Sequence, residues 1–286
     1  MNIWQALFLG LLQGSTELFP VSSLGHAVLV PKLLGWDYNQ ADPTFLPYIT
    51  LLHLGTAAAL LLVFRDDWLK IVGGFVRAAY RGRIGEDRNE RLGVLLFVGT
   101  IPAGLLGAFF ESDLKKLFAS PRVAAIFLLI NAAIMGGGEL LRRRDERRRR
   151  ALSGADRERA YETEAELSIP KAAIVGVSQS LALLPGISRS GSTITAGLLA
   201  GLKHESAARF SFLLATPIIL AAGILEVPTL FTAGSPLLMY LAGAAVATVT
   251  AYVSARFLLR YFRSGRLDPF AAYCAVLGIV GLIATR

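Results

Sequence analysis

Six long apolar segments, almost free of charged residues, constrain this chain more than any other feature of its sequence. At 1.5 Å per residue, about 20 helical residues cross the roughly 30 Å hydrocarbon core of a bilayer. The shorter segments need polar ends that extend to the interface. The sequence therefore predicts an all-α polytopic membrane protein. The predicted spans are roughly residues 46–64, 92–110, 122–141, 210–226, 237–255 and 269–285.

Composition excludes the main soluble classes. The chain is 54% hydrophobic and only 17% charged, against about 45–50% and 25% in ordinary soluble domains. The basic run from Arg142 to Arg150 would suit a nucleic acid, but its apolar neighbours favour a cytoplasmic membrane loop and no nucleic-acid partner. Cys274 is the one cysteine, so an intrachain disulfide is excluded and core packing is expected.

Two further apolar regions, 2–35 and 171–202, are broken in the middle. Each has two short apolar arms around a tip rich in Ser, Gly and Pro, and each arm is too short to span alone. The tips are residues 18–26 and 185–193. Proline and glycine end helices, and irregular backbone at membrane depth is tolerated only inside protein or beside a wet cavity. The pattern predicts two re-entrant helical hairpins.

The two hairpins are related by an offset of 166 residues, which aligns five identical residues without a gap. The pairs are Gly10 with Gly176, Gln13 with Gln179, Leu18 with Leu184, Ser22 with Ser188, and Gly25 with Gly191. Each half holds one hairpin and three spans, so the second half must enter from the opposite side, which predicts an inverted-topology repeat. The predicted units are residues 1–141, a basic cytoplasmic linker 142–170, and residues 171–286.

Charge placement predicts the orientation. If the first hairpin enters from outside, the inside loops carry 23 of the 29 Lys and Arg residues, as the positive-inside rule requires. These loops are 65–91, 142–171, 203–209 and 256–266.

Glu17, His26, His53 and Arg189 are the main ionisable residues predicted at membrane depth, where such residues by default mark a functional site. Arginine suits phosphate, hydroxyl groups donate to phosphate oxygens, and glycines let backbone N–H groups approach an anion. If the hairpin tips meet, they form an anion site with an acid/base pair that opens to lipid. The further residues of this predicted site are Ser22, Ser23, Ser188, Ser190, Gly191 and Thr193.

Structural interpretations of the same residues stay open at this stage. Ser22, Ser190 and Ser192 could cap helices, Arg189 could only balance Glu17, and His26 could be a packing residue. For His53, a structural polar contact and a role in the site are equally supported by the sequence. The Gly136-Gly137-Gly138 strip predicts close helix packing.

The segment from Gln13 to His26 resembles the first motif of the undecaprenyl-diphosphate phosphatases, the bacitracin-resistance membrane family. The segment from Pro185 to Thr193 resembles that family's second motif, and the resemblance covers essentially the whole chain. The resemblance implies a multi-pass enzyme of the bacterial cytoplasmic membrane that hydrolyses the polyprenyl lipid undecaprenyl diphosphate. Such an enzyme recycles the lipid carrier for cell-wall peptidoglycan and contributes to bacitracin resistance. The resemblance also implies that Glu17, Ser23, His26 and Arg189 are catalytic and that a divalent cation, Mg²⁺ or Ca²⁺, takes part.

The chain departs from the family pattern at the site. Gln13 stands where the family usually has a glutamate, and His53 stands where it tends to have glutamine. A neutral amide neutralises a cation less well than a carboxylate does, so the expected metal site is Glu17 with help from Gln13 or His53.

The sequence suggests the following mechanism. Arg189 and the serines hold the diphosphate, Ser23 or a water attacks the terminal phosphorus, and His26 transfers the proton. The alternative is a lipid-phosphate flippase, because inverted repeats with broken helices are typical of secondary transporters. The sequence does not decide between a monomer and a homodimer.

Overall fold

The computed structural model describes residues 1–36, 44–118, 120–149, 161–232 and 236–285, and this part of the chain is all-helical, with one isolated β-bridge between Glu162 and Leu202. The elements in chain order are α1 (Ile3–Thr16), α2 (Ser23–Leu33), α3 (Phe45–Val63), α4 (Arg65–Arg81), α5 (Arg88–Phe118), α6 (Pro121–Arg149), α8 (Ile169–Ser180), the 3₁₀ turn η1 (Leu181–Leu183), α9 (Arg189–Leu199), α10 (His204–Glu226), α11 (Thr229–Thr232), α12 (Leu237–Tyr261) and α13 (Asp268–Ala284).

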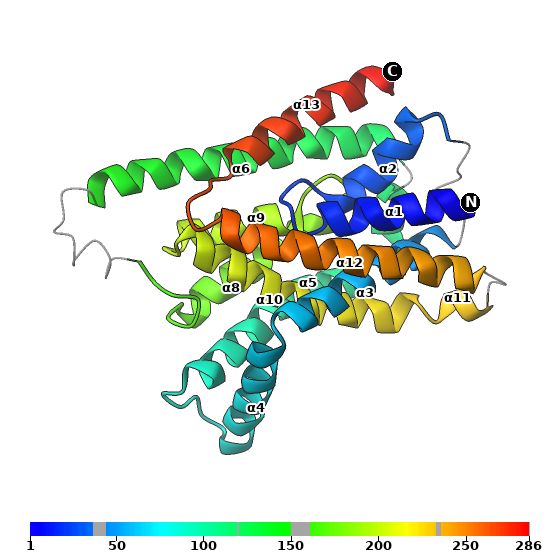
Figure 1. The fold of residues 1–286 in the computed structure, drawn as a ribbon. Coiled ribbons are helices and arrows are strands. Elements are labelled where there is room, and N and C mark those ends of the chain that lie inside the picture. The colour runs from blue at the N-terminus through cyan, green and yellow to red at the C-terminus, as the bar shows by residue number, and fades with distance from the viewer. Residues whose placement is uncertain (37–43, 119, 150–160, 233–235, 286) are drawn as a thin grey trace.

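Long helices surround the two short pairs, α1–α2 and α8–α9 (Figure 1). Helix α12 packs against both α1 and α3, α13 packs along α6, and α8 packs on α5. Helix α10 contacts α3, α5 and α9. Both chain ends lie at the same end of the bundle. The tips of the two short pairs meet in the interior, while α1 and α8 keep exposed apolar side chains such as Trp4 and Ile174.

Five helices of the described chain are long and apolar enough to cross a membrane, which agrees with a multi-pass membrane protein. Six spans were predicted. The sixth is α13, which has 17 residues and falls short of a full span by length. The five are Phe45–Val63, Arg88–Phe110, Pro121–Arg147, His204–Glu226 and Leu237–Tyr261.

The predicted inside loops contain more helix than expected. Residues 65–91 were predicted as a loop, but Arg65–Arg81 forms α4 and α5 already begins at Arg88. Ile71, Gly74 and Ala78 of α4 are buried, and this helix packs on α5. The arginine run beginning at Arg142 was also predicted as a loop, yet α6 continues to Arg149. Residues 150–160 of the predicted linker lie outside the described part.

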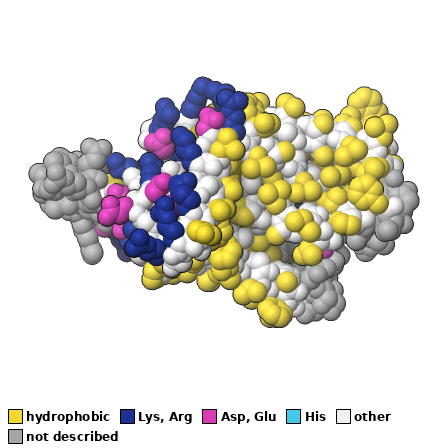
Figure 2. Space-filling view, turned by 90° about the horizontal axis from the view of Figure 1, so that it is seen from below, with side chains coloured by type: hydrophobic (Ala, Val, Ile, Leu, Met, Phe, Trp, Pro, Cys, Tyr) yellow, Lys and Arg dark blue, Asp and Glu magenta, His cyan; other side chains and the backbone are white. Residues whose placement is uncertain are grey.

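Lys and Arg side chains gather in a band at one end of the molecule, while hydrophobic side chains cover most of the remaining surface on this face (Figure 2). Large apolar side chains such as Phe109, Ile224 and Leu238 are more than two-thirds exposed to solvent in the isolated chain. A lipid environment accepts such a surface at no cost, whereas water would not. The surface therefore matches the sequence-based prediction of a protein embedded in a bilayer.

Glycines allow α1 and α12 to approach closely. A Cβ atom added at Gly10 would collide with the backbone of Gly243, and one at Gly14 would lie 2.9 Å from the nitrogen of Ala251. Small residues at such crossings are the usual solution where helices pack in membranes. The Gly136-Gly137-Gly138 strip was predicted to serve the same purpose, but a Cβ atom added at Gly136 or Gly137 would meet no other part of the described structure within 4 Å. Only Gly138 abuts another helix, at Thr195 of α9.

Candidate functional site

Each hairpin tip contains a serine that caps the helix after it. The Ser22 hydroxyl accepts a hydrogen bond from the Gly25 N–H at 3.2 Å, and the Ser188 hydroxyl accepts one from the Gly191 N–H at 3.1 Å. N-terminal N–H groups of a helix have no partner within the helix, which is why serine is favoured here. The capping interpretation is confirmed for Ser22, and the equivalent Ser188 has the same role. Because both capping serines line one cavity, the positive ends of α2 and α9 converge there.

The backbone of Ser22 is strained. Its φ of 68° is the only positive value at a non-glycine residue in the described chain. A side chain in this region costs about 1–3 kcal/mol and persists only when the surroundings impose it. Such strain at a turn that holds predicted site residues is consistent with a functional role for the tip.

The side chain of Asn131, on α6, joins the two tips. Its Nδ2 donates to the carbonyl oxygen of Pro20 at 3.3 Å, and its Oδ1 accepts from the N–H of Ser188 at 3.1 Å. The hydroxyl of Ser190 adds a direct bond between the tips by donating to the carbonyl oxygen of Phe19 at 3.1 Å. Asn131 is fully buried, so this connection is shielded from competing water.

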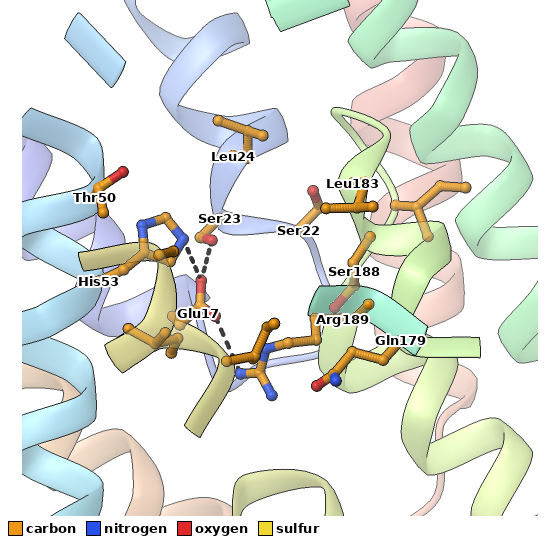
Figure 3. A pocket seen from close by; sticks show the side chains of 16 residues that line it. Glu17, Ser22, Ser23, Leu24, Thr50, His53, Gln179, Leu183, Ser188 and Arg189 are labelled. Carbon is orange, nitrogen blue, oxygen red and sulfur yellow. Dashed lines mark hydrogen bonds and ion pairs between the residues drawn. The ribbon is translucent and has the colours of Figure 1, made fainter. Parts of the chain in front are cut away.

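Glu17 is the centre of the polar network (Figure 3). Its carboxylate accepts from Nη2 of Arg189 at 3.1 Å, from Nε2 of Gln13 at 3.1 Å and from the hydroxyl of Ser23. Nε2 of His53 lies 3.1 Å from the same carboxylate. Glu17 is only 6% exposed, and burying a carboxylate costs several kcal/mol unless partners compensate it. The surrounding donors supply that compensation.

His53 is held on its other side as well. Its Nδ1 lies 2.7 Å from the carbonyl oxygen of Ile49, one turn earlier on α3. Both ring nitrogens therefore face hydrogen-bond acceptors, and a ring that carries two protons donates to both.

A cavity of about 230 Å³ lies between the two tips, α3, α5 and α10. Its polar wall contains Glu17, Ser22, Ser23, His53, Ser188 and Arg189. Ala103, Leu183, Ile218 and Ala222 belong to its apolar wall. A site with charge at one side and aliphatic groups at the other suits an amphiphile with an anionic head.

Some predicted site residues lie beside the cavity rather than in its wall. Nδ1 of His26 bonds the carbonyl oxygen of Ser22 at 2.7 Å, and its Nε2 bonds the hydroxyl of Tyr273 at 2.7 Å. The Thr193 hydroxyl pairs with that of Ser211 at 2.6 Å, which ties α9 to α10. Ser190 and Gly191 are also buried and do not line the cavity.

Gln179 and Thr50 also line the cavity, although neither was among the predicted site residues. The 166-residue offset paired Gln179 with Gln13, and that pairing was a signal that could have identified it. Thr50 carries no comparable signal, since it is one small polar residue within an apolar span.

The donors for a divalent cation are few. The described residues contain no cluster of three or more His, Cys, Asp or Glu side chains, and Glu17 is the only carboxylate among the cavity residues. Gln13 does not line the cavity, but its amide is bonded to Glu17 and its buried Oε1 has no hydrogen-bond partner in the described structure, so it offers one further oxygen beside Glu17. Mg²⁺ is commonly bound through one or two carboxylates together with substrate phosphates and water, so this donor set fits a cation that binds together with a phosphorylated ligand.

Comparison with known proteins agrees with the geometry. The family model described as "Bacitracin resistance protein BacA" matches residues 6–280. The chain is 45% identical over 289 residues to "Undecaprenyl-diphosphatase 2" of Chromobacterium violaceum, covering 99% of both chains. It is 47% identical over 286 residues to "Undecaprenyl-diphosphatase" of Acidiphilium cryptum, covering 97% of this chain and 96% of the relative.

Proposed function

The chain belongs to the bacitracin resistance protein BacA family, and from this membership we propose that it hydrolyses undecaprenyl diphosphate to undecaprenyl phosphate and inorganic phosphate. The observation that carries the proposal is the Glu17–Arg189–Ser23 constellation in a cavity with an apolar wall, in a chain whose curated relatives are named undecaprenyl-diphosphatases. The reaction returns the lipid carrier to cell-wall synthesis. The transport alternative finds no support among these relatives.

The polar wall supplies what phosphoryl transfer requires, namely positioning and neutralisation of charge. The Arg189 guanidinium donates to Glu17 at 3.1 Å and to the carbonyl oxygen of Ser211 at 3.2 Å, and both contacts fix its plane. Its Nε has no partner in the described structure, which leaves donor capacity for the diphosphate. The N-termini of α2 and α9 add positive potential at the same place.

Glu17 is proposed to accept the proton of the attacking hydroxyl, because Ser23 already donates to it. The Ser23 oxygen then forms a bond to the terminal phosphorus while the bond from that phosphorus to the bridging oxygen breaks, and undecaprenyl phosphate leaves. A water then hydrolyses the phosphoserine, which releases inorganic phosphate and restores Ser23. If a water at this position attacks instead, inorganic phosphate is released in that single step. His26 is assigned a positioning role instead of the proton transfer expected from the sequence. Its bond to the Ser22 carbonyl holds the strained turn next to Ser23.

A divalent cation, Mg²⁺ or Ca²⁺, is proposed to be held by Glu17 and the free oxygen of Gln13 together with phosphate oxygens. It would supply charge neutralisation. Gln13→Glu places a second carboxylate four residues before Glu17, so the metal concentration needed for half-maximal activity should fall. A titration of activity against Mg²⁺ measures this, and an unchanged midpoint in an active enzyme would show that position 13 does not bind the cation.

The finer architecture is also proposed: two inverted repeats, each a re-entrant hairpin with three membrane helices, in the bacterial cytoplasmic membrane. The shared serine caps support it. In Figure 1, α1 begins at the end of the bundle where both termini lie, and the chain enters α8 from the opposite end.

Purified protein incubated with undecaprenyl diphosphate tests the function directly. We expect release of inorganic phosphate that Ser23→Ala reduces strongly and that a chelator abolishes. Transfer of intact lipid across vesicles without phosphate release would contradict hydrolysis and favour transport.

A further inference from the structure

Gln179 occupies the last turn of α8 and lines the cavity next to the second tip (Figure 3). Its side chain is 2% exposed. Neither its Oε1 nor its Nε2 has a hydrogen-bond partner in the described structure. In Figure 3 the side chain extends toward the guanidinium of Arg189.

A buried amide without partners is costly. Each unsatisfied polar atom costs about 1–3 kcal/mol, and buried polar groups in folded proteins are almost always paired. The equivalent residue of the first half, Gln13, has its donor satisfied by Glu17, four residues on. The residue four positions after Gln179 is Leu183, which offers no acceptor. The amide of Gln179 therefore has no built-in partner and points to one that arrives with the ligand.

We propose that Gln179 is a substrate-binding residue whose Nε2–H donates to a diphosphate oxygen beside Arg189. The inference rests on the proposed function for the identity of the anion. Two donors of the cavity wall, Gln179 Nε2 and Arg189 Nε, have no partner among the described residues, and a diphosphate offers several acceptors at once. Ser188 and Arg189 of the same hairpin also line the cavity, so the amide would extend the polar wall that receives the anion.

Gln179→Leu tests the role of the amide in substrate binding separately from its effect on stability. It removes the amide and keeps a side chain of similar reach, so KM for undecaprenyl diphosphate should rise by about tenfold, the loss of one hydrogen bond to a charged group. The thermal unfolding midpoint should stay level or rise, because an unsatisfied amide is removed. Gln179→Glu should raise KM further, since its carboxylate repels the diphosphate.

Thr56→Val is the matched control. Thr56 is also fully buried, its hydroxyl has no partner in the described structure, and it does not line the cavity. This variant should keep the parental KM. A Gln179→Leu enzyme with parental KM, as expected if an internal water or packing alone explains Gln179, would overturn the inference, and so would a lowered unfolding midpoint with unchanged kinetics.

Inorganic pyrophosphate provides a readout that does not need turnover. It should raise the unfolding midpoint of the parent and of Thr56→Val, and raise that of Gln179→Leu less. A parent that releases no phosphate from the lipid would defeat the proposed function, while the pyrophosphate shifts would still decide whether Gln179 binds the anion. Equal shifts in all three proteins would overturn its role.

Discussion

Arg189 is the residue whose two contacts define the site, because its guanidinium bonds both Glu17 and the Ser211 carbonyl. Lysine keeps the charge but cannot reproduce the planar fork. We expect Arg189→Lys to lower kcat by about 10²-fold, the size of losing one well-placed transition-state donor, with little change in stability. Arg263→Lys, which alters an exposed ion pair with Glu205, is the control and should behave like the parent. Near-parental turnover of Arg189→Lys would mean that Arg189 only balances Glu17.

His53 allows a second test at the same carboxylate. Glutamine can still donate to Glu17 through its amide, and it is the residue that the family tends to have at this position. We therefore expect His53→Gln to keep most of the activity. His53→Leu leaves Glu17 with one donor fewer and should lower kcat/KM by about tenfold or more, since a hydrogen bond to a charged group contributes about 1.5–3 kcal/mol. If His53→Gln were as impaired as His53→Leu, the imidazole itself would be required.

Much of the cavity wall could be predicted from the sequence, and the reason is electrostatic. Glu17 and Arg189 were identifiable because charges at membrane depth are costly, and the serines followed from their place in the tips. Gln179 was missed because an amide carries no charge. The contact of His26 with Tyr273, on α13, could not be predicted, since a motif does not show which face of α2 meets which later helix.

At the scale of elements, the crossing of α1 and α12 places Glu17, because this residue directly follows α1. Gly14→Ala adds a Cβ at 2.9 Å from the Ala251 nitrogen, and such overpacking costs typically about 1–3 kcal/mol. We expect a lower unfolding midpoint in detergent together with reduced kcat. Gly137→Ala meets nothing within 4 Å and should be neutral or gain about 0.5–1 kcal/mol from helix propensity. Equal effects of the two substitutions would show that the crossing is not tightly packed.

The sequence predicted the apolar helices well and the charged ones poorly. Spans such as 46–64 differ from α3 by one residue at each end, because continuous hydropathy is a strong signal. Helix α4 was missed because it carries both charged and apolar side chains, among them the exposed Leu69 and Tyr80. The continuation of α6 to Arg149 was missed because the run of arginines was interpreted as a loop.

For the whole molecule, the charge band of Figure 2 predicts the orientation. In a Cys274→Ala background, a cysteine replacing Ser264 should be protected from a membrane-impermeant thiol reagent in intact cells, and one replacing Lys32 should react. Both positions are exposed in the described structure, so packing within the protein does not shield either cysteine from the reagent. The opposite labelling pattern would reverse the topology.

The ion pair between Glu17 and Arg189 joins residues 172 positions apart, which sets an order on biosynthesis. At about 5–20 residues per second, the ribosome adds Arg189 roughly 10 to 30 s after Glu17. Until then the first hairpin carries an acidic group without its cation, which is unfavourable deep in hydrocarbon. The polar site is therefore completed only after the second tip has been made and can supply the guanidinium that Glu17 lacks until then.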